Sequence, residues 1–178
     1  MSVVGELGAG VGMDDIARAS HIAKPVFYRY FKDKAELFVE VGRAVGETVV
    51  AETTAAIDAA PSPRLKLAAG IDAYLASIES RPELYRFVLQ YRDLGDYATI
   101  VGQHATVVIG DLMRQAGQDS GSAELWGFGI VGLVRAAADR WLEERTMSRA
   151  AVVHYLTDLI WPGLAGMPAG QYRTIDAI

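Results

Sequence analysis

The sequence predicts an all-α protein in which a small N-terminal domain precedes a larger helical body. Apolar residues recur at helical spacing along most of the 178 residues, and no segment shows the alternation of a half-buried strand. Helix-starting pairs, Asp33 with Glu36 and Ser62 with Pro63, stand directly before two such segments. These observations indicate helices throughout.

Several expected helices have a start or stop signal of their own. A glycine-rich stretch at residues 8–12 ends a short opening segment. Pro25 lies in the first turn of the second short helix, where a backbone N–H would have no partner within the helix. Ser148 is a good N-cap, and Pro162 either ends or kinks the last helix. The expected helices are 13–20, 24–30, 33–58, 63–80, 82–93, 97–118, 123–145 and 148–164.

The composition indicates a cytoplasmic protein. The chain has no cysteine, which excludes disulfides, thiolate metal sites and a cysteine nucleophile. No apolar run reaches the roughly 18 residues that a membrane span needs. The opening residues lack the basic and long apolar regions of a secretory signal. We therefore expect one or two small domains with no membrane partner.

Charge is unevenly distributed along the chain. Residues 13–34 carry five basic and three acidic side chains, a net charge of +2. Because the whole chain carries −5, the remaining residues carry −7. A small positive domain on an acidic body suits a protein that touches nucleic-acid phosphate at one end only.

Two short helices joined by a three-residue turn, followed at once by a long capped helix, have the arrangement of a helix-turn-helix unit, whose second helix enters the major groove of DNA. Phe27 and Phe31 are four residues apart and are expected to face inward with Ile16, Ala17 and Ile22. The lysines and tyrosines of the outward face suit phosphate contacts, and Val26 suits a thymine methyl. The expected DNA contacts are Lys24, Pro25, Val26, Tyr28, Tyr30 and Lys34.

These residues resemble the DNA-binding signature of the TetR family. The matching segments are Asp15-Ile16-Ala17, the run from Lys24 to Phe31, and Lys34-Ala35-Glu36-Leu37. The resemblance implies a nine-helix, Ω-shaped homodimer. Its first three helices would bind palindromic operator DNA, and its last two would pair with the partner subunit as a four-helix bundle. The expected domains are 1–46 for DNA binding and 47–178 for ligand binding and dimerisation, and the expected function is a repressor that a small apolar effector releases.

Several positions depart from the family pattern and leave a second function open. Gly12 and Ala23 stand where Ser or Thr usually caps a helix, and His21 stands where the turn usually has Gly. The first helix is short, so either the native chain starts upstream of Met1 or disordered residues are absent from the sequence. The alternative function is a helical small-molecule-binding or scaffold protein whose N-terminal domain no longer binds DNA.

Aromatic residues cluster in the middle helices, where they form either core or a ligand pocket. The resemblance places an inducer between these helices and the eighth helix. His104 lies in a mostly apolar helix and is expected either as a hydrogen-bonded core residue or as a pocket residue. The expected pocket residues are Tyr74, Tyr85, Tyr91, His104, Trp126 and Ile130.

Three glycines within one expected helix, Gly127, Gly129 and Gly132, each cost about 1 kcal/mol relative to alanine. A closely approaching partner helix or room for a ligand would offset this cost, and we favour the partner helix. The last expected helix adds an apolar stripe at helical spacing. The expected dimer contacts are Gly129, Gly132, Ala136, Val152, Leu156, Leu159 and Ile160.

The sequence does not predict an enzyme. It contains no serine elbow, no phosphate-binding loop and no matched acid–base pair. Asp14 and Asp15 would point about 100° apart on a helix, so we expect them to favour the helix dipole rather than share a proton. His154 and Asp158 are four residues apart but have no third ligand nearby. We therefore expect neither a metal nor a cofactor.

Overall fold

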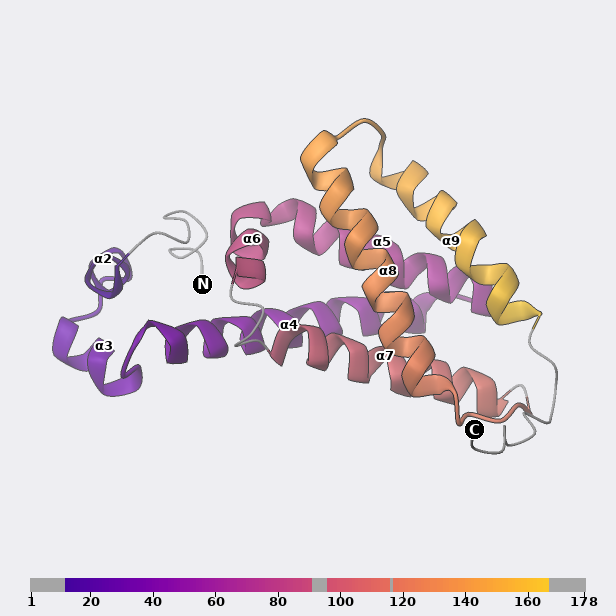
Figure 1. The fold of residues 1–178 in the computed structure, drawn as a ribbon, viewed down its shortest axis with the longest axis horizontal. Coiled ribbons are helices and arrows are strands. Elements are labelled where there is room, and N and C mark those ends of the chain that lie inside the picture. The colour runs from indigo at the N-terminus through magenta and orange to yellow at the C-terminus, as the bar shows by residue number, and fades with distance from the viewer. Residues whose placement is uncertain (1–11, 91–95, 116, 167–178) are drawn as a thin grey trace, which may run out of the picture.

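The computed structural model describes residues 12–90, 96–115 and 117–166, and all regular structure within them is helical, as predicted. Figure 1 shows two short helices at one end of the long axis and the other helices gathered into a body. None of the described helices is both long and apolar enough to cross a bilayer. The helices are α2 (Met13–Ala19), α3 (Lys24–Tyr30), α4 (Lys34–Ala59), α5 (Pro63–Ser80), α6 (Pro82–Gln90), α7 (Asp96–Gln115), α8 (Ala123–Glu144) and α9 (Arg149–Ala165).

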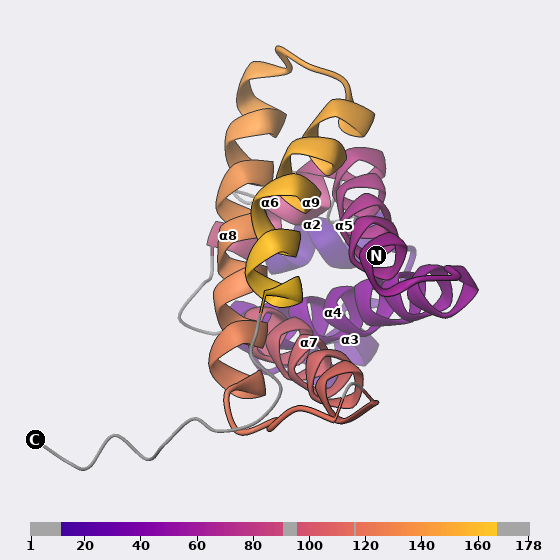
Figure 2. The ribbon, with the colours of Figure 1, turned by 90° about the vertical axis from the view of Figure 1, so that its right-hand side faces the viewer.

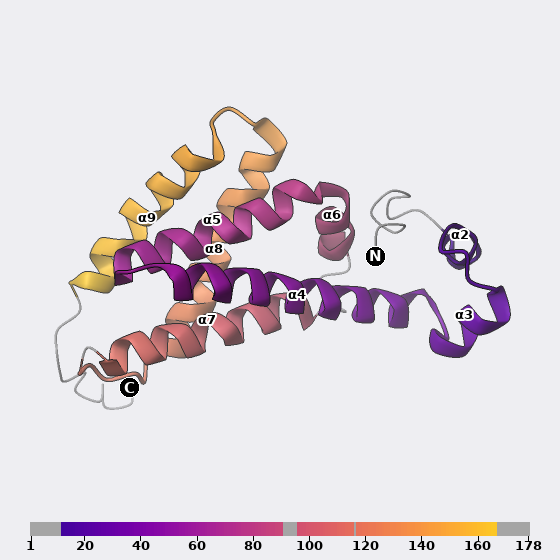
Figure 3. The ribbon, with the colours of Figure 1, turned by 180° about the vertical axis from the view of Figure 1, so that it is seen from behind.

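Helix α4 belongs to both parts of the molecule. Its first turns bury Leu37 and Phe38 in the same apolar cluster as Ile16 of α2 and Phe27 of α3. Its 26 residues span about 39 Å, and Figure 3 shows them running from α3 through the body. One continuous helix therefore connects the N-terminal pair with the body.

The body is built around α4 and α5. Helices α5 and α7 both pack along α4, α8 packs on α7, and α9 packs on α5. Figure 2, seen along the long axis, shows these five helices arranged around the middle of the body. At the α7–α8 contact, a Cβ on Gly127 would lie 2.7 Å from the backbone N of Thr106, so this position requires glycine. The loss of helix stability that Gly127 causes is thus offset by the close packing of α8 on α7 within the same chain, and not by a helix of a partner subunit.

The predicted N-caps are confirmed. The Asp33 carboxylate accepts a hydrogen bond from the Glu36 N–H at 2.9 Å. Ser62 and Ser148 cap α5 and α9 in the same way through their hydroxyl oxygens. The Glu36 carboxylate accepts from the Lys32 N–H at 2.7 Å, one residue before the cap. These local bonds explain why most helix starts could be located in the sequence.

One helix end differs from expectation. Helix α7 stops at Gln115 rather than near 118, because Gly117 turns left-handed with φ +70°. There the Gln118 N–H donates to the Met113 carbonyl at 2.9 Å, which closes the helix end. Helix α9 ends at Ala165, within one residue of the expected 164, and of the two expected effects of Pro162 the ending of the helix does not occur.

Candidate functional site

The turn between α2 and α3 is closed by backbone hydrogen bonds. The N–H groups of His21 and Ile22 donate to the carbonyls of Arg18 and Ala17, each at 3.1 Å. His21 takes a left-handed backbone with φ 55°, which glycine adopts at lower cost. The histidine therefore stores some strain, but the turn keeps the bonded form that orients α3 relative to α2.

Helices α2 and α3 with the turn between them form the N-terminal head of the protein. The inward face of this head is small and apolar. Phe27 is 3% exposed and its ring lies 5.2 Å, centre to centre, from that of the partly buried Phe31. Ile16 and Ala17 are buried with them, as predicted. The prediction for Ile22 is wrong, because its side chain is 43% exposed. Ile22 lies in the turn between α2 and α3 and not on the inward face of either helix.

The outward face of α3 carries the side chains that were expected to meet DNA. Lys34, at the start of α4, is half-buried, with its Nζ 5.3 Å from the centre of the Phe38 ring. The head thus presents a row of basic and phenolic donors beside an apolar side chain. The exposed residues of the row are Lys24, Pro25, Val26, Tyr28 and Tyr30.

Asp14 of α2 reaches across to this row, a contact that sequence reasoning missed. Lys24 Nζ donates to Asp14 Oδ2 at 2.7 Å, and Tyr28 Oη donates to Asp14 Oδ1 at 3.1 Å. These two bonds, that from Lys24 foremost, lower the pKa of Asp14 below its ordinary value. Asp15, its neighbour, bonds only within its own helix in the described contacts, to Arg18 at 3.1 Å.

The body has a partly open cavity of about 580 Å³ between α4, α5, α7, α8 and α9. Its walls are mostly aliphatic side chains, with Tyr74 and Trp161 as the aromatic members. A mostly apolar cavity of this size suits a small organic molecule. Residues from α5 and α9, which sequence reasoning missed, supply much of the wall: Pro63, Lys66, Leu67, Gly70, Ile71, Trp161, Leu164 and Ala165.

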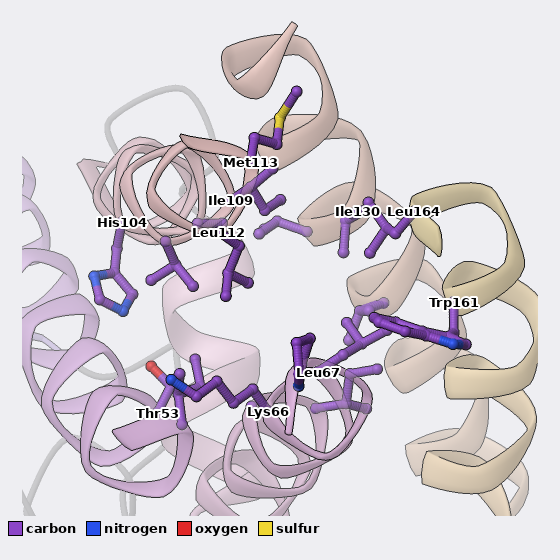
Figure 4. Close-up of a pocket in the computed structure, with 18 of the residues that line it drawn as sticks. Thr53, Lys66, Leu67, His104, Ile109, Leu112, Met113, Ile130, Trp161 and Leu164 are labelled. Atoms are coloured by element: carbon purple, nitrogen blue, oxygen red, sulfur yellow. The ribbon is translucent and has the colours of Figure 1, made fainter. Parts of the chain in front are cut away.

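Three of the polar side chains that line this cavity lie together at one side. Figure 4 shows Thr53, Lys66 and His104 there, with Ile130, Trp161 and Leu164 opposite. His104 Nε2 lies 3.1 Å from Thr54 Oγ1, whose single hydroxyl proton is already donated to the Val50 carbonyl. The imidazole Nε2–H therefore donates to Thr54. Burial lowers the pKa of His104, and the nearby charge of Asp58 opposes this only in part, so the ring is neutral near pH 7.

The expected pocket residues fall into three groups. Tyr74, His104 and Ile130 line the cavity, and His104 is hydrogen-bonded as well, so its two expected roles coexist. Tyr85 does not line it, because its hydroxyl is turned to Asp139 of α8 at 2.6 Å. Trp126 also lies outside this lining and packs against a small separate cluster near Ile109. Tyr91 lies outside the described residues.

The expected dimer contacts include both buried and exposed residues. Val152, Leu156 and Ile160 are buried within the chain itself, which does not fit their expected role as dimer contacts. The apolar stripe that they form packs on α5. Leu159, by contrast, is 66% exposed. On α8, Gly129, Gly132 and Ala136 are exposed as well.

His154 and Asp158 form a surface pair, with His154 Nε2 3.4 Å from Asp158 Oδ2. Asp158 is also bonded to Arg64 of α5. Within the described ranges, no three histidine or carboxylate side chains are grouped in a way that could hold a metal ion.

Family models match both parts of the chain. Residues 6–41 match the model described as bacterial regulatory proteins of the tetR family. Residues 52–172 match the model of a tetracyclin repressor-like C-terminal domain.

Known proteins agree with these matches. An uncharacterised HTH-type transcriptional regulator of Mycobacterium tuberculosis is 31% identical over 167 residues, covering 90% of this chain and 71% of the relative. The HTH-type transcriptional activator FasR of Mycolicibacterium smegmatis is 26% identical, covering 88% of this chain and 75% of the relative.

Solved structures share the fold. A TetR-like transcriptional regulator from Rhodococcus superposes with a TM-score of 0.68 at 24% identity, covering 93% of this chain and 91% of the other. The TetR family repressor AlkX from Dietzia has a TM-score of 0.63 at 20% identity, with 88% of each chain covered. The chain is therefore not an enzyme but a DNA-binding transcriptional regulator, and it belongs to the TetR family.

Proposed function

We propose that the protein is a cytoplasmic repressor that binds palindromic operator DNA as a homodimer and is released when a small apolar ligand fills the body cavity. The single observation that carries this proposal is the course of α4. Leu37 and Phe38 at its start pack on the DNA-binding head, while Thr53 and Ile57 near its end line the cavity. A change in the cavity can therefore alter the position of the head through one rigid element.

The outward face of α3 supports the DNA contacts. Lys24, Tyr28 and Tyr30 would donate to phosphate oxygens, and Lys34 would add a charge beside them. Val26 would pack on a thymine methyl in the major groove. Because such contacts release counterions, operator binding should weaken steeply with salt.

An exposed apolar face on α8 and α9 supports the homodimer. A Cβ added to Gly129 or Gly132 would meet nothing within 4 Å in the described chain, so packing inside the monomer does not account for these helix glycines. The same two helices expose apolar side chains that a second copy would bury: Leu125, Phe128, Leu133 and Ala136 on α8, with Tyr155 and Leu159 on α9. We propose that the α8–α9 pairs of two subunits pack together here.

The lining of the cavity supports an apolar ligand with one polar end. Aliphatic side chains would hold the apolar part, and Thr53, Lys66 and His104 would bond the polar part. The names of related proteins include both activation and repression of transcription, since FasR is called an activator and AlkX a repressor. We propose repression, which predicts that deleting the gene raises expression from a reporter placed under its operator; lowered expression would show activation instead.

The DNA-binding part is tested by selecting bound duplexes from a random library and measuring affinity for the selected site by fluorescence anisotropy. We expect Lys24→Ala/Tyr28→Ala to weaken binding by about 100-fold or more, at roughly 1–3 kcal/mol for each charged hydrogen bond lost. Arg114→Ala is the control, because it removes a positive charge from the end of α7 far from the head. Undiminished binding by the double variant would refute the assignment and favour a scaffold without DNA-binding activity.

A further inference from the structure

Asp14 holds two of the groups that the proposed function assigns to DNA phosphate. Its two carboxylate oxygens each accept one hydrogen bond from α3, Oδ2 from Lys24 at 2.7 Å and Oδ1 from Tyr28 at 3.1 Å. The side chains of Asp14 and Lys24 are about half exposed, so this contact lies on the surface that would face the duplex.

A carboxylate used in this way resembles the phosphate that it would meet. Both are anions that present two oxygens, and both accept hydrogen bonds without donating any. Lys24 has three N–H groups and could in principle serve two acceptors. Tyr28 has one hydroxyl proton, which Asp14 already accepts. Tyr28 can therefore donate to a phosphate only after it leaves Asp14.

We propose that Asp14 is a built-in competitor of the DNA backbone, which occupies the phosphate donors Lys24 and Tyr28 in the free head and thereby lowers the affinity for DNA. This inference rests on the proposed function, since it takes those two residues as phosphate contacts. Aspartate is ionised at neutral pH at its ordinary pKa, and the two hydrogen bonds lower the pKa of Asp14 further, so the competition is present under physiological conditions. Exposed ion pairs are weak enough for a phosphate to displace them.

The neighbouring residue provides a matched control. Asp15 lies in the same first turn of α2 and carries the same charge, but its described ion pair is with Arg18 of its own helix. Asp14→Asn and Asp15→Asn therefore remove the same charge from nearly the same place. Only the first releases Lys24 and Tyr28.

The experiment measures the Kd of both variants for the selected duplex by fluorescence anisotropy. We expect Asp14→Asn to bind about 3- to 30-fold more tightly than Asp15→Asn, since each of the two heads of a dimer is freed of one exposed ion pair. Asp14→Ser, which lacks the amide oxygen of Asn, should show the same gain. Circular dichroism melting checks that all variants are folded. Equal affinities of Asp14→Asn and Asp15→Asn, or weaker binding by Asp14→Asn, would overturn the inference.

A double-mutant cycle separates this inference from the function on which it rests. In a Lys24→Met/Tyr28→Phe background α3 no longer offers Asp14 these two hydrogen-bond donors. The difference in DNA affinity between the Asp14→Asn and Asp15→Asn variants should therefore vanish. If Lys24→Met/Tyr28→Phe itself binds DNA like the wild type, the proposed assignment of the phosphate contacts fails. If it binds weakly but the difference persists in that background, only the role of Asp14 fails.

Discussion

The hydroxyl of Tyr85 donates a 2.6 Å hydrogen bond to the Asp139 carboxylate, which joins α6 to α8. The same hydroxyl lies 3.2 Å from the hydroxyl of Tyr74, a residue that lines the cavity. Burial, and then the bond to Asp139, raises the pKa of Tyr85 well above its ordinary value, so the phenol stays protonated. A chain of polar contacts thus runs from the cavity wall to α8.

Removing this hydroxyl should destabilise the body. We expect Tyr85→Phe to lower the free energy of unfolding by about 1–2 kcal/mol, because Asp139 loses a charge-assisted hydrogen bond in a half-buried place. Urea unfolding measures the change. Tyr30→Phe, which removes a hydroxyl from an exposed ring, should change the same quantity by less than about 0.5 kcal/mol. Equal effects of the two variants would show that the Tyr85 bond contributes nothing.

Added bulk inside the cavity should weaken the binding of apolar molecules. Val108 lines the cavity, whereas its neighbour Val107 on the same helix is 58% exposed. We expect Val108→Trp to weaken binding of the apolar dye Nile red by about tenfold or more, and Val107→Trp to leave it unchanged. Dye fluorescence titrations measure both. Similar weakening by the two variants would mean that the dye binds elsewhere or that added bulk acts non-specifically.

Stability should fall in mild acid because of His104. Burial lowers its pKa in the folded state, so the unfolded chain takes up a proton first as the pH falls below about 6.5. The contribution of the neutral, buried imidazole to the free energy of unfolding is complete above that pH and is lost as the pH falls through the folded-state pKa of His104. We expect urea unfolding from pH 8 to 5 to show a shallower decline for His104→Asn than for the wild type. Parallel profiles would contradict this account of the imidazole.

A charge on the exposed face of α9 should weaken dimerisation. Leu159 is 66% exposed in the monomer and would be buried between two subunits. We expect Leu159→Glu to weaken dimerisation by about tenfold or more, since an unpaired carboxylate is costly to bury. Light scattering coupled to gel filtration measures the mass. Ile22→Glu, at an exposed apolar residue of the head, should leave the mass unchanged, and a Leu159→Glu protein that stays dimeric would exclude this face.

The features that the sequence predicted well are those that depend on neighbouring residues. The caps at Asp33, Ser62 and Ser148 are contacts across three residues, and each marked the start of its helix correctly. The inward direction of Phe27 and Phe31 follows from their spacing on one helical turn or just beyond it. Local geometry alone determines these features.

The features that were missed depend on which distant surfaces meet. Helix α9 is apolar on two faces, and periodicity does not tell which face packs on α5; Leu156 is buried while Leu159 is exposed. The cavity wall brings Leu67 of α5 together with Trp161 of α9, which are far apart in the sequence. Asp14 meets Tyr28 only because the turn between α2 and α3 folds back.

The central claim, that the outward face of α3 reads DNA, is tested most directly by changing Val26, the apolar residue of that face. Selection from a random duplex library is carried out with the wild type and with Val26→Asn in parallel. Because asparagine pairs with adenine where valine packs on a thymine methyl, we expect one base position in each half-site to change and the others to stay. Identical selected sequences from both proteins would contradict the claim.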